Sequence, residues 1–172
     1  MPLDGDFIPL QIIRDLMATD FQAHCAAIAT ARGEPVPAPL TEIRDDPRPF
    51  SGLSVNGPSA RIGPFDLAVD DQHVESTTLS EVLLGSVVIA DMTGGPDSVA
   101  LANVMRIRKV ALLRTFAASA VHPVYGAPPY RGVLRYKFVK SVGTPGLPKG
   151  ADGAWWQAVG AQVRFTFFDT ID

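Results

Sequence analysis

The sequence predicts an α/β fold of the α+β type, with a mainly antiparallel sheet flanked by two helices and a long proline-rich arm. Three observations predict it. Residues 9–32 carry an apolar stripe at helical spacing, residues 33–64 hold seven prolines, and residues 154–168 alternate apolar and polar side chains. The 172 residues have the length of a single domain, and 47% of them are hydrophobic, enough to bury an ordinary core.

The first helix is predicted over residues 9–32. Pro9 suits its first turn, where a missing N–H costs nothing, and Gly33 suits the position after its last turn. His24 and Cys25 are neighbours in sequence, so their side chains diverge on a helix and do not form a nucleophile and its base. The apolar stripe predicted to face the core consists of Ile12, Ile13, Leu16, Met17, Phe21, Cys25 and Ile28.

An extended arm is predicted over residues 33–60, because prolines at this density disfavour both a helix and a central strand. A short edge strand is expected near residues 53–55. Apolar residues interrupt the prolines, and an arm that lies on a neighbouring subunit would explain them. These residues are Leu40, Ile43, Phe50 and Leu53.

Two strands are predicted next, over residues 61–70 and 82–90. The second is almost entirely apolar, which is typical of a strand covered on both faces. The stretch between them is polar, and a metal site there would need ligands fixed by further contacts, which the flanking sequence does not suggest. We therefore expect a solvated loop to carry Asp70, Asp71, His73 and Glu75.

A second helix is predicted over residues 98–118, with Asp97 or Ser98 as its cap. A short helix to about residue 106 followed by a strand fits the same pattern. The segment carries four basic residues and no acid, which predicts a face that forms salt bridges with the acidic half of the chain rather than one that contacts phosphates. These residues are Arg106, Arg108, Lys109 and Arg114.

The remaining strands are predicted over residues 131–142 and 154–168. A loop with three glycines and two prolines joins them, which is consistent with an antiparallel hairpin. Trp155 and Trp156 lie at the start of the second strand, and adjacent residues of a strand point to opposite faces. At least one of the two tryptophans is therefore expected to be exposed or at an interface.

Charge is unevenly distributed along the chain, whose net charge is −3. Residues 1–98 hold 15 acidic and 5 basic residues, whereas residues 99–172 hold 10 basic and 3 acidic residues. Either the two halves fold against each other, or each subunit pairs its acidic side with the basic side of a neighbour. The acidic balance of the whole chain disfavours nucleic-acid binding.

The sequence also argues against several classes of function. A single cysteine excludes a disulfide framework, the first ten residues lack the basic residues of a signal peptide, and no apolar run could span a bilayer. We found no nucleophile, metal-ligand or phosphate-loop motif, so the chain is not expected to be an enzyme or to bind a metal or cofactor. The residues 91–98 are the exception, because they resemble the strand-Asp-Thr-Gly turn of nucleoside 2-deoxyribosyltransferase-like and TIR-like domains.

The predicted order of elements resembles the tail terminator family of tail-completion proteins from tailed bacteriophages. The resemblance covers most of the chain and includes the closing strand GAQVRFTFF. It implies a virion protein, assembled in the host cytoplasm, that forms a ring, commonly a hexamer. This ring caps the tail tube and joins it to the neck.

The resemblance also implies tail-tube and neck or connector proteins as partners, no membrane, and at most transient DNA contact through the ring lumen. It provides no catalytic site. A head-completion or adaptor subunit, and a small nucleotide-binding domain built on residues 91–98, are the alternatives. The residues predicted to lie at interfaces are Phe50, Leu53, Arg106, Arg108, Lys109, Trp155 and Trp156.

Overall fold

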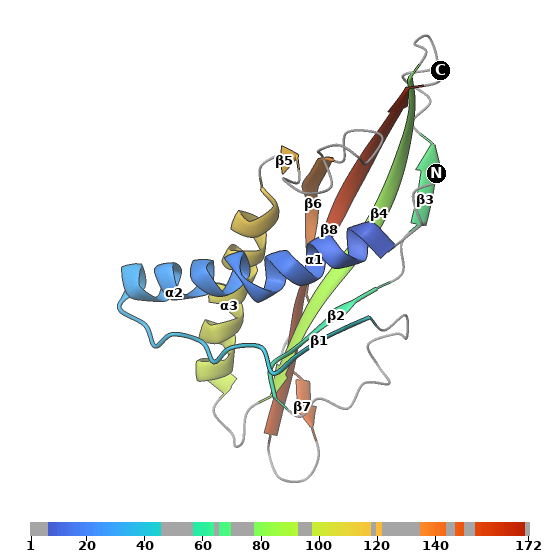
Figure 1. Cartoon of the computed structure of the whole chain (residues 1–172). Coiled ribbons are helices and arrows are strands. Elements are labelled where there is room, and N and C mark those ends of the chain that lie inside the picture. The colour runs from blue at the N-terminus through green and yellow to red at the C-terminus, as the bar shows by residue number, and fades with distance from the viewer. Residues whose placement is uncertain are drawn as a thin grey trace.

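The structure of the chain, a computed structural model, describes residues 7–45, 57–63, 66–69, 78–92, 98–117, 120–121, 135–143, 147–149 and 154–170. The helices are α1 (Phe7–Ala18), α2 (Asp20–Arg32) and α3 (Ser98–Phe116). The strands are β1 (Glu42–Asp45), β2 (Ser59–Ile62), β3 (Asp66–Val69), β4 (Thr78–Met92), β5 (Ala120–Val121), β6 (Arg135–Gly143), β7 (Leu147–Lys149) and β8 (Ala154–Thr170). This combination confirms the predicted α+β class (Figure 1).

All described strands belong to one sheet with the order β1-β2-β4-β8-β6-β5, to which β3 adds beside β4 and β7 beside β8. The centre of the sheet is the antiparallel ladder of β4 and β8, which runs from Thr78 opposite Thr170 to Met92 opposite Trp156. Every strand pair is antiparallel except β1 with β2. The prediction of a mainly antiparallel sheet is therefore confirmed.

The helices pack on one face of this sheet, which we call the helix side. Side chains alternate along a strand, so Val87 and Ile89 of β4 point to the helix side together with Val163 and Phe165 of β8. They share one buried cluster with residues of all three helices. On the opposite face, which we call the far side, Ala90 of β4 is fully buried as well. The expectation that residues 82–90 are covered on both faces holds at this point of the strand.

The predicted first helix consists of two segments that continue almost in line (Figure 1). Thr19 interrupts them with φ −112° and ψ −75°. Its backbone N–H still donates to the carbonyl of Asp15 (3.1 Å), and its hydroxyl donates to the same oxygen (2.8 Å). A threonine hydroxyl bonded to the carbonyl four residues earlier distorts a helix locally, which explains the break.

The end of this helical region is as predicted. Gly33 has φ +64°, and its N–H donates to the carbonyl of Thr30, while the N–H of Glu34 donates to that of Ala29. These two bonds form a Schellman motif, which a glycine satisfies without strain.

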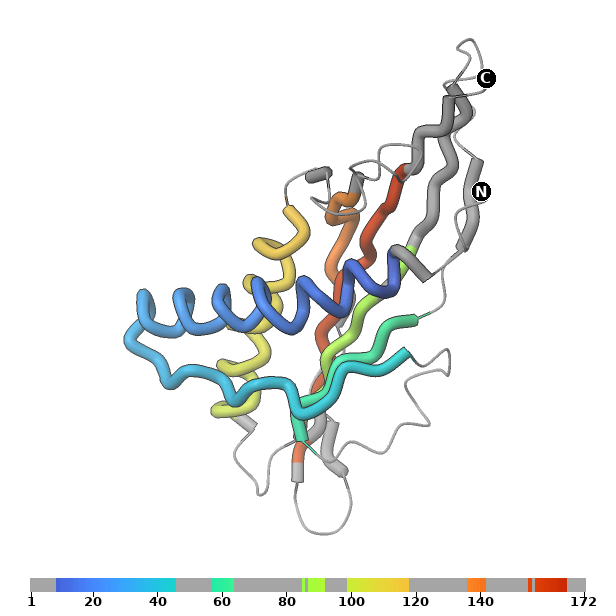
Figure 2. Tube along the Cα trace, in the orientation of Figure 1, coloured from blue at the N-terminus to red at the C-terminus, as the bar shows by residue number. Residues whose placement is uncertain are grey.

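The prediction for the arm is wrong in part. Residues 34–41 run from α2 along α3 and lead into β1, which joins the sheet of its own chain (Figure 2). The N–H of Thr41 donates to the carbonyl of Pro58 (2.8 Å), which starts the parallel pairing of β1 with β2. Leu40 and Ile43, both half-buried, pack against the main core of their own chain. The edge strand expected near residues 53–55 lies outside the described residues.

The other predicted elements are largely confirmed. The residues 98–116 form one helix, so the alternative of a helix followed by a strand is wrong. The strand predicted over 61–70 is two strands, β2 and β3, which pair with different parts of β4. The antiparallel hairpin of the C-terminal part is present as the pair of β6 with β8.

Candidate assembly surfaces

The helix α3 separates buried from exposed side chains along its length. Its buried stripe includes Leu101, Met105, Arg108, Leu112 and Phe116, which follow one another at intervals of three or four residues. Val99, Arg106 and Leu113 follow each other at intervals of seven residues and therefore share the opposite side of the helix. Val99 is 69% exposed and Leu113 is 43% exposed. We call this exposed side the basic face of α3: Val99, Arg106, Lys109, Leu113 and Arg114.

The cations of this basic face lack acidic partners within the described part of the chain. The helix contains no Asp or Glu. Arg106 donates a hydrogen bond to the side chain of Asn103 (3.4 Å), which is on the same helix. Neither Lys109 nor Arg114 forms an ion pair with another described residue. The basic face of α3 therefore carries positive charge that no described acid of the chain neutralises.

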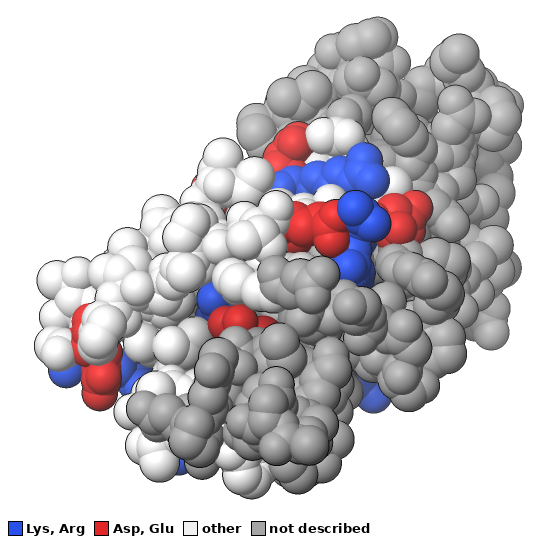
Figure 3. All heavy atoms as spheres, turned by 90° about the horizontal axis from the view of Figure 1, so that it is seen from below, with Lys and Arg blue, Asp and Glu red and all other residues white. Residues whose placement is uncertain are grey.

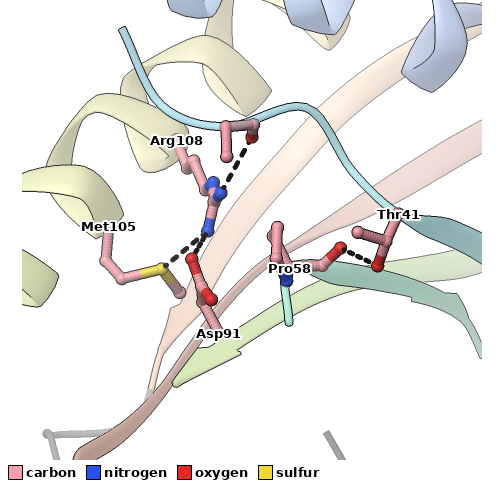
Figure 4. A network of polar contacts seen from close by, with 6 residues as sticks. Thr41, Pro58, Asp91, Met105 and Arg108 are labelled. Carbon is pink, nitrogen blue, oxygen red and sulfur yellow. Dashed lines mark hydrogen bonds and ion pairs between the residues drawn. The ribbon is translucent and has the colours of Figure 1, made fainter. Parts of the chain in front are cut away.

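Arg108 is not part of this surface, which corrects its placement among the interface residues. Its side chain is only 1% exposed, and it forms an ion pair with Asp91 at the end of β4 (Figure 4). Its second terminal nitrogen donates to the carbonyl of Ala38 in the arm (3.2 Å), and the first lies 3.7 Å from the sulfur of Met105. This one side chain thus connects α3, the central strand β4 and the segment that precedes β1.

The Arg108–Asp91 pair agrees with one part of the sequence analysis. Asp91 belongs to the acidic half and Arg108 to the basic half, so a contact between the halves exists inside one subunit. It uses one of the four cations of the helix. Because buried charges are tolerated only when they are paired, we infer that this contact is structural.

The predicted aromatic interface residues are only partly described. Trp155 is half-buried and packs against the main core, so it belongs to the interior on the helix side. The side chain of Trp156 lies outside the described residues, as do Phe50 and Leu53. Whether these three reach an interface stays a prediction.

Acidic and basic side chains meet at the edge formed by β1 and β2. Glu42 forms ion pairs with Arg44 on its own strand and with Arg61 of β2 (3.0 Å for the latter). Arg61 is buried, whereas Arg44 and the next residue, Asp45, are exposed. Figure 3 shows basic and acidic atoms side by side on one face of the molecule. Charge is therefore balanced locally here, unlike on the basic face of α3.

The remaining chemical candidates are accounted for within the described residues. Cys25 is buried, which raises the pKa of its thiol to about 11, and the nearby charge of Arg108 offsets this rise only in part.

No three His, Cys, Asp or Glu side chains of the described part come together as metal ligands. The stretch with Asp70, Asp71, His73 and Glu75 lies outside that part. No described helix has both the length and the apolar character needed to cross a membrane.

The turn that resembles nucleotide-binding domains is described only at its ends. Asp91, its first residue, has its carboxylate engaged by Arg108. Residues 93–97 lie outside the described part. A nucleotide site at residues 91–98 stays a prediction.

The chain has matches among solved structures. No protein-family model matches the chain, and no curated protein does. Among solved structures, the chain is similar to a chain of the virion of a native gene transfer agent (GTA) particle, with 16% identity and a TM-score of 0.38. The match covers 88% of this chain and 97% of that chain. A similarity of this size carries no argument about function, which has to come from the surfaces described above.

Proposed function

We propose that this chain is a structural protein of a phage-like virion and that it assembles into the ring, commonly a hexamer, that ends the tail tube and joins it to the neck. In this role the chain transforms no substrate, binds no cofactor, and contacts tail-tube and neck proteins. The observation that carries the proposal is the basic face of α3, where Arg106, Lys109 and Arg114 are exposed without acidic partners in the described chain. The order of helices and strands supports it.

The acids that this face would meet are on the other half of the chain. Asp15 of α1, Asp20 and Glu34 at the two ends of α2, and Asp45 of β1 are all exposed. A contact between the basic face of one subunit and these acids of the next is heterologous, and heterologous contacts that close by rotation form rings. Exposed Val99 and Leu113 would add apolar area to the contact.

The first test is the oligomeric state of the purified protein. Light scattering after size-exclusion chromatography at low salt should give a discrete multimer, and the double variant Arg106→Glu/Lys109→Glu should dissociate it. Charge reversal of Asp15→Lys and Asp45→Lys in that variant should restore the multimer. Arg32→Gln, an exposed cation on α2 outside the basic face, is the matched control and should leave the multimer intact.

The second test is the position of the protein in the particle. Electron microscopy of virions with a labelled copy should place it between the tail tube and the head. A position inside the head-completion complex would identify the chain as an adaptor subunit instead. A protein that stays monomeric at low salt and is missing from purified virions would overturn the proposal.

A further inference from the structure

We propose that the free edge of β6 binds β1 of a second copy, so that the sheets of neighbouring subunits continue into one another. The inference rests on the proposed homo-oligomer and specifies how its subunits join. Its starting point is the two ends of the sheet as the described strands form it. Among these strands, the path begins with β1, which pairs with β2 alone, and ends with β6 and the two-residue β5.

Most of the outer edge of β6 is unpaired within the described chain. β5 covers only Arg135 and Tyr136, so the stretch from Lys137 to Gly143 has β8 on one side and no described strand on the other. Lys137, Val139, Lys140 and Ser141 are exposed, Val139 at 46%. An open strand edge presents unpaired N–H and C=O groups, which an added strand can satisfy.

The strand directions allow an antiparallel junction. β1 runs parallel to β2, and β2, β4, β8 and β6 alternate in direction. Consequently β1 and β6 of one subunit run in opposite directions. A rotation about an axis roughly along the strands preserves these directions, so β1 of the next copy would lie antiparallel to β6.

The two edges also match face by face. On the far side of the sheet, Lys137 and Lys140 would lie near Glu42 and Arg44 of the next copy, because the register partners place all four residues on that face. On the helix side, half-buried Phe138 would meet half-buried Ile43. Apolar side chains of one face pack together, and the two acids and one base of β1 give it a net charge opposite to that of the two lysines.

The helix layer would meet its counterpart at the same junction. α3 packs over β8 and β6, whereas α1 packs beside β1. A second copy joined through β1 would therefore bring Asp15 and Asp45, both exposed, toward the basic face of α3. The strand edge and the basic face become two parts of one interface.

A symmetric contact between two β6 edges is disfavoured. It would place Lys137 and Lys140 of one copy against the same lysines of the other, and like charges on opposed strands are destabilising. The register between Phe138 and Lys140 is irregular, so any strand added at this edge has to accommodate the bulge. β1, with two acids and one base, has a net charge opposite to that of the lysines and is therefore a better partner for this edge than a second β6.

The test is cysteine cross-linking of the full chain in a Cys25→Ser background. Arg44→Cys on β1 is combined with Lys137→Cys or with Lys140→Cys on β6, all at exposed far-side positions. Treatment with a short bismaleimide should convert each double variant into a ladder of covalent multimers. Each single variant should stay uncross-linked, because β6 does not meet β6 and β1 does not meet β1. A pair of Arg32→Cys with Lys140→Cys is the matched control and should give no ladder.

The outcomes separate this inference from the proposed function. Dimers from Lys140→Cys alone would show a symmetric contact and overturn the inference. Multimers in light scattering without cross-links in either double variant would overturn it as well, while leaving the ring proposal standing. Monomers throughout would overturn both. Cross-linked ladders whose largest member equals the multimer in light scattering would support the closed junction.

Discussion

The buried pair of Arg108 and Asp91 leads to the most specific prediction about stability. Replacing Asp91 by Ala leaves the Arg108 guanidinium, only 1% exposed, with the carbonyl of Ala38 as its one remaining described oxygen acceptor. Removing one partner of a buried ion pair costs about 3–5 kcal/mol. For a chain of 172 residues this lowers the melting temperature by about 6–20 °C.

Replacing the arginine of the pair should lower the free energy of unfolding less than replacing the aspartate. Arg108→Met leaves the Asp91 carboxylate, whose side chain is 13% exposed and can be hydrated, and the thioether fills part of the space. The double variant should lose clearly less stability than the sum of the two single variants, because the isolated buried cation is then gone. Urea unfolding of the unmodified chain, the two single variants and the double variant measures the coupling energy of this double-mutant cycle. A second salt concentration should change the coupling energy little, since the pair is shielded from solvent.

Two results would refute the reasoning. If Asp91→Ala changes the free energy of unfolding by less than 1 kcal/mol, the guanidinium is not held as described. If the single losses simply add in the double variant, the two side chains do not interact. Should Asp91→Ala fail to fold, Asp91→Asn provides the measurement, because it keeps an oxygen acceptor and should lose less.

Three further predictions concern individual positions. Gly160→Ala should lower the free energy of unfolding by about 1–3 kcal/mol in urea, since a Cβ there would lie 2.8 Å from the carbonyl oxygen of Val87; an unchanged midpoint would contradict the close approach of β4 and β8. Gly33→Ala should cost about 1–2 kcal/mol, because φ is +64° while no atom lies within 4 Å of the new Cβ. The Cys25 thiol should resist a disulfide reagent at pH 8 until the chain unfolds. Its pKa is about 11 in the folded state against 9.0 in the reference state, so the unfolded chain loses this proton first and stability should fall between pH 9 and 11, less so in Cys25→Ser.

The sequence predicts the elements of this fold better than their pairing. The helical spacing of apolar residues and the terminal glycine were sufficient to predict the helical region of α1 and α2, because both signals are local in the sequence. The break at Thr19 could not be predicted, since it depends on a hydroxyl that bonds to Asp15 rather than to water. The place of β1 in the sheet could not be predicted either, because a parallel pair with β2 is fixed by contacts between distant segments.

The basic face of α3 could have been predicted more closely from the spacing of residues along the helix. Arg108 lies three residues after Met105 and four before Leu112, so it falls within the buried stripe. Val99 and Leu113 lie seven residues on either side of Arg106 and mark its exposed face. The partner of Arg108 could not be read in the same way, because Asp91 comes from a strand that only the folded sheet brings beneath the helix.

The ladder between β4 and β8 has a consequence for how the chain is made. Its partners are separated by 64 residues at Met92 and Trp156 and by 92 residues at Thr78 and Thr170. During translation β4 therefore emerges long before the strand that completes its hydrogen bonds, and such distant pairing slows folding. Until β8 is synthesised, β2 and β3 can pair with one edge of this apolar strand, but its other edge lacks its partner, and an unpaired apolar edge favours aggregation of the nascent chain.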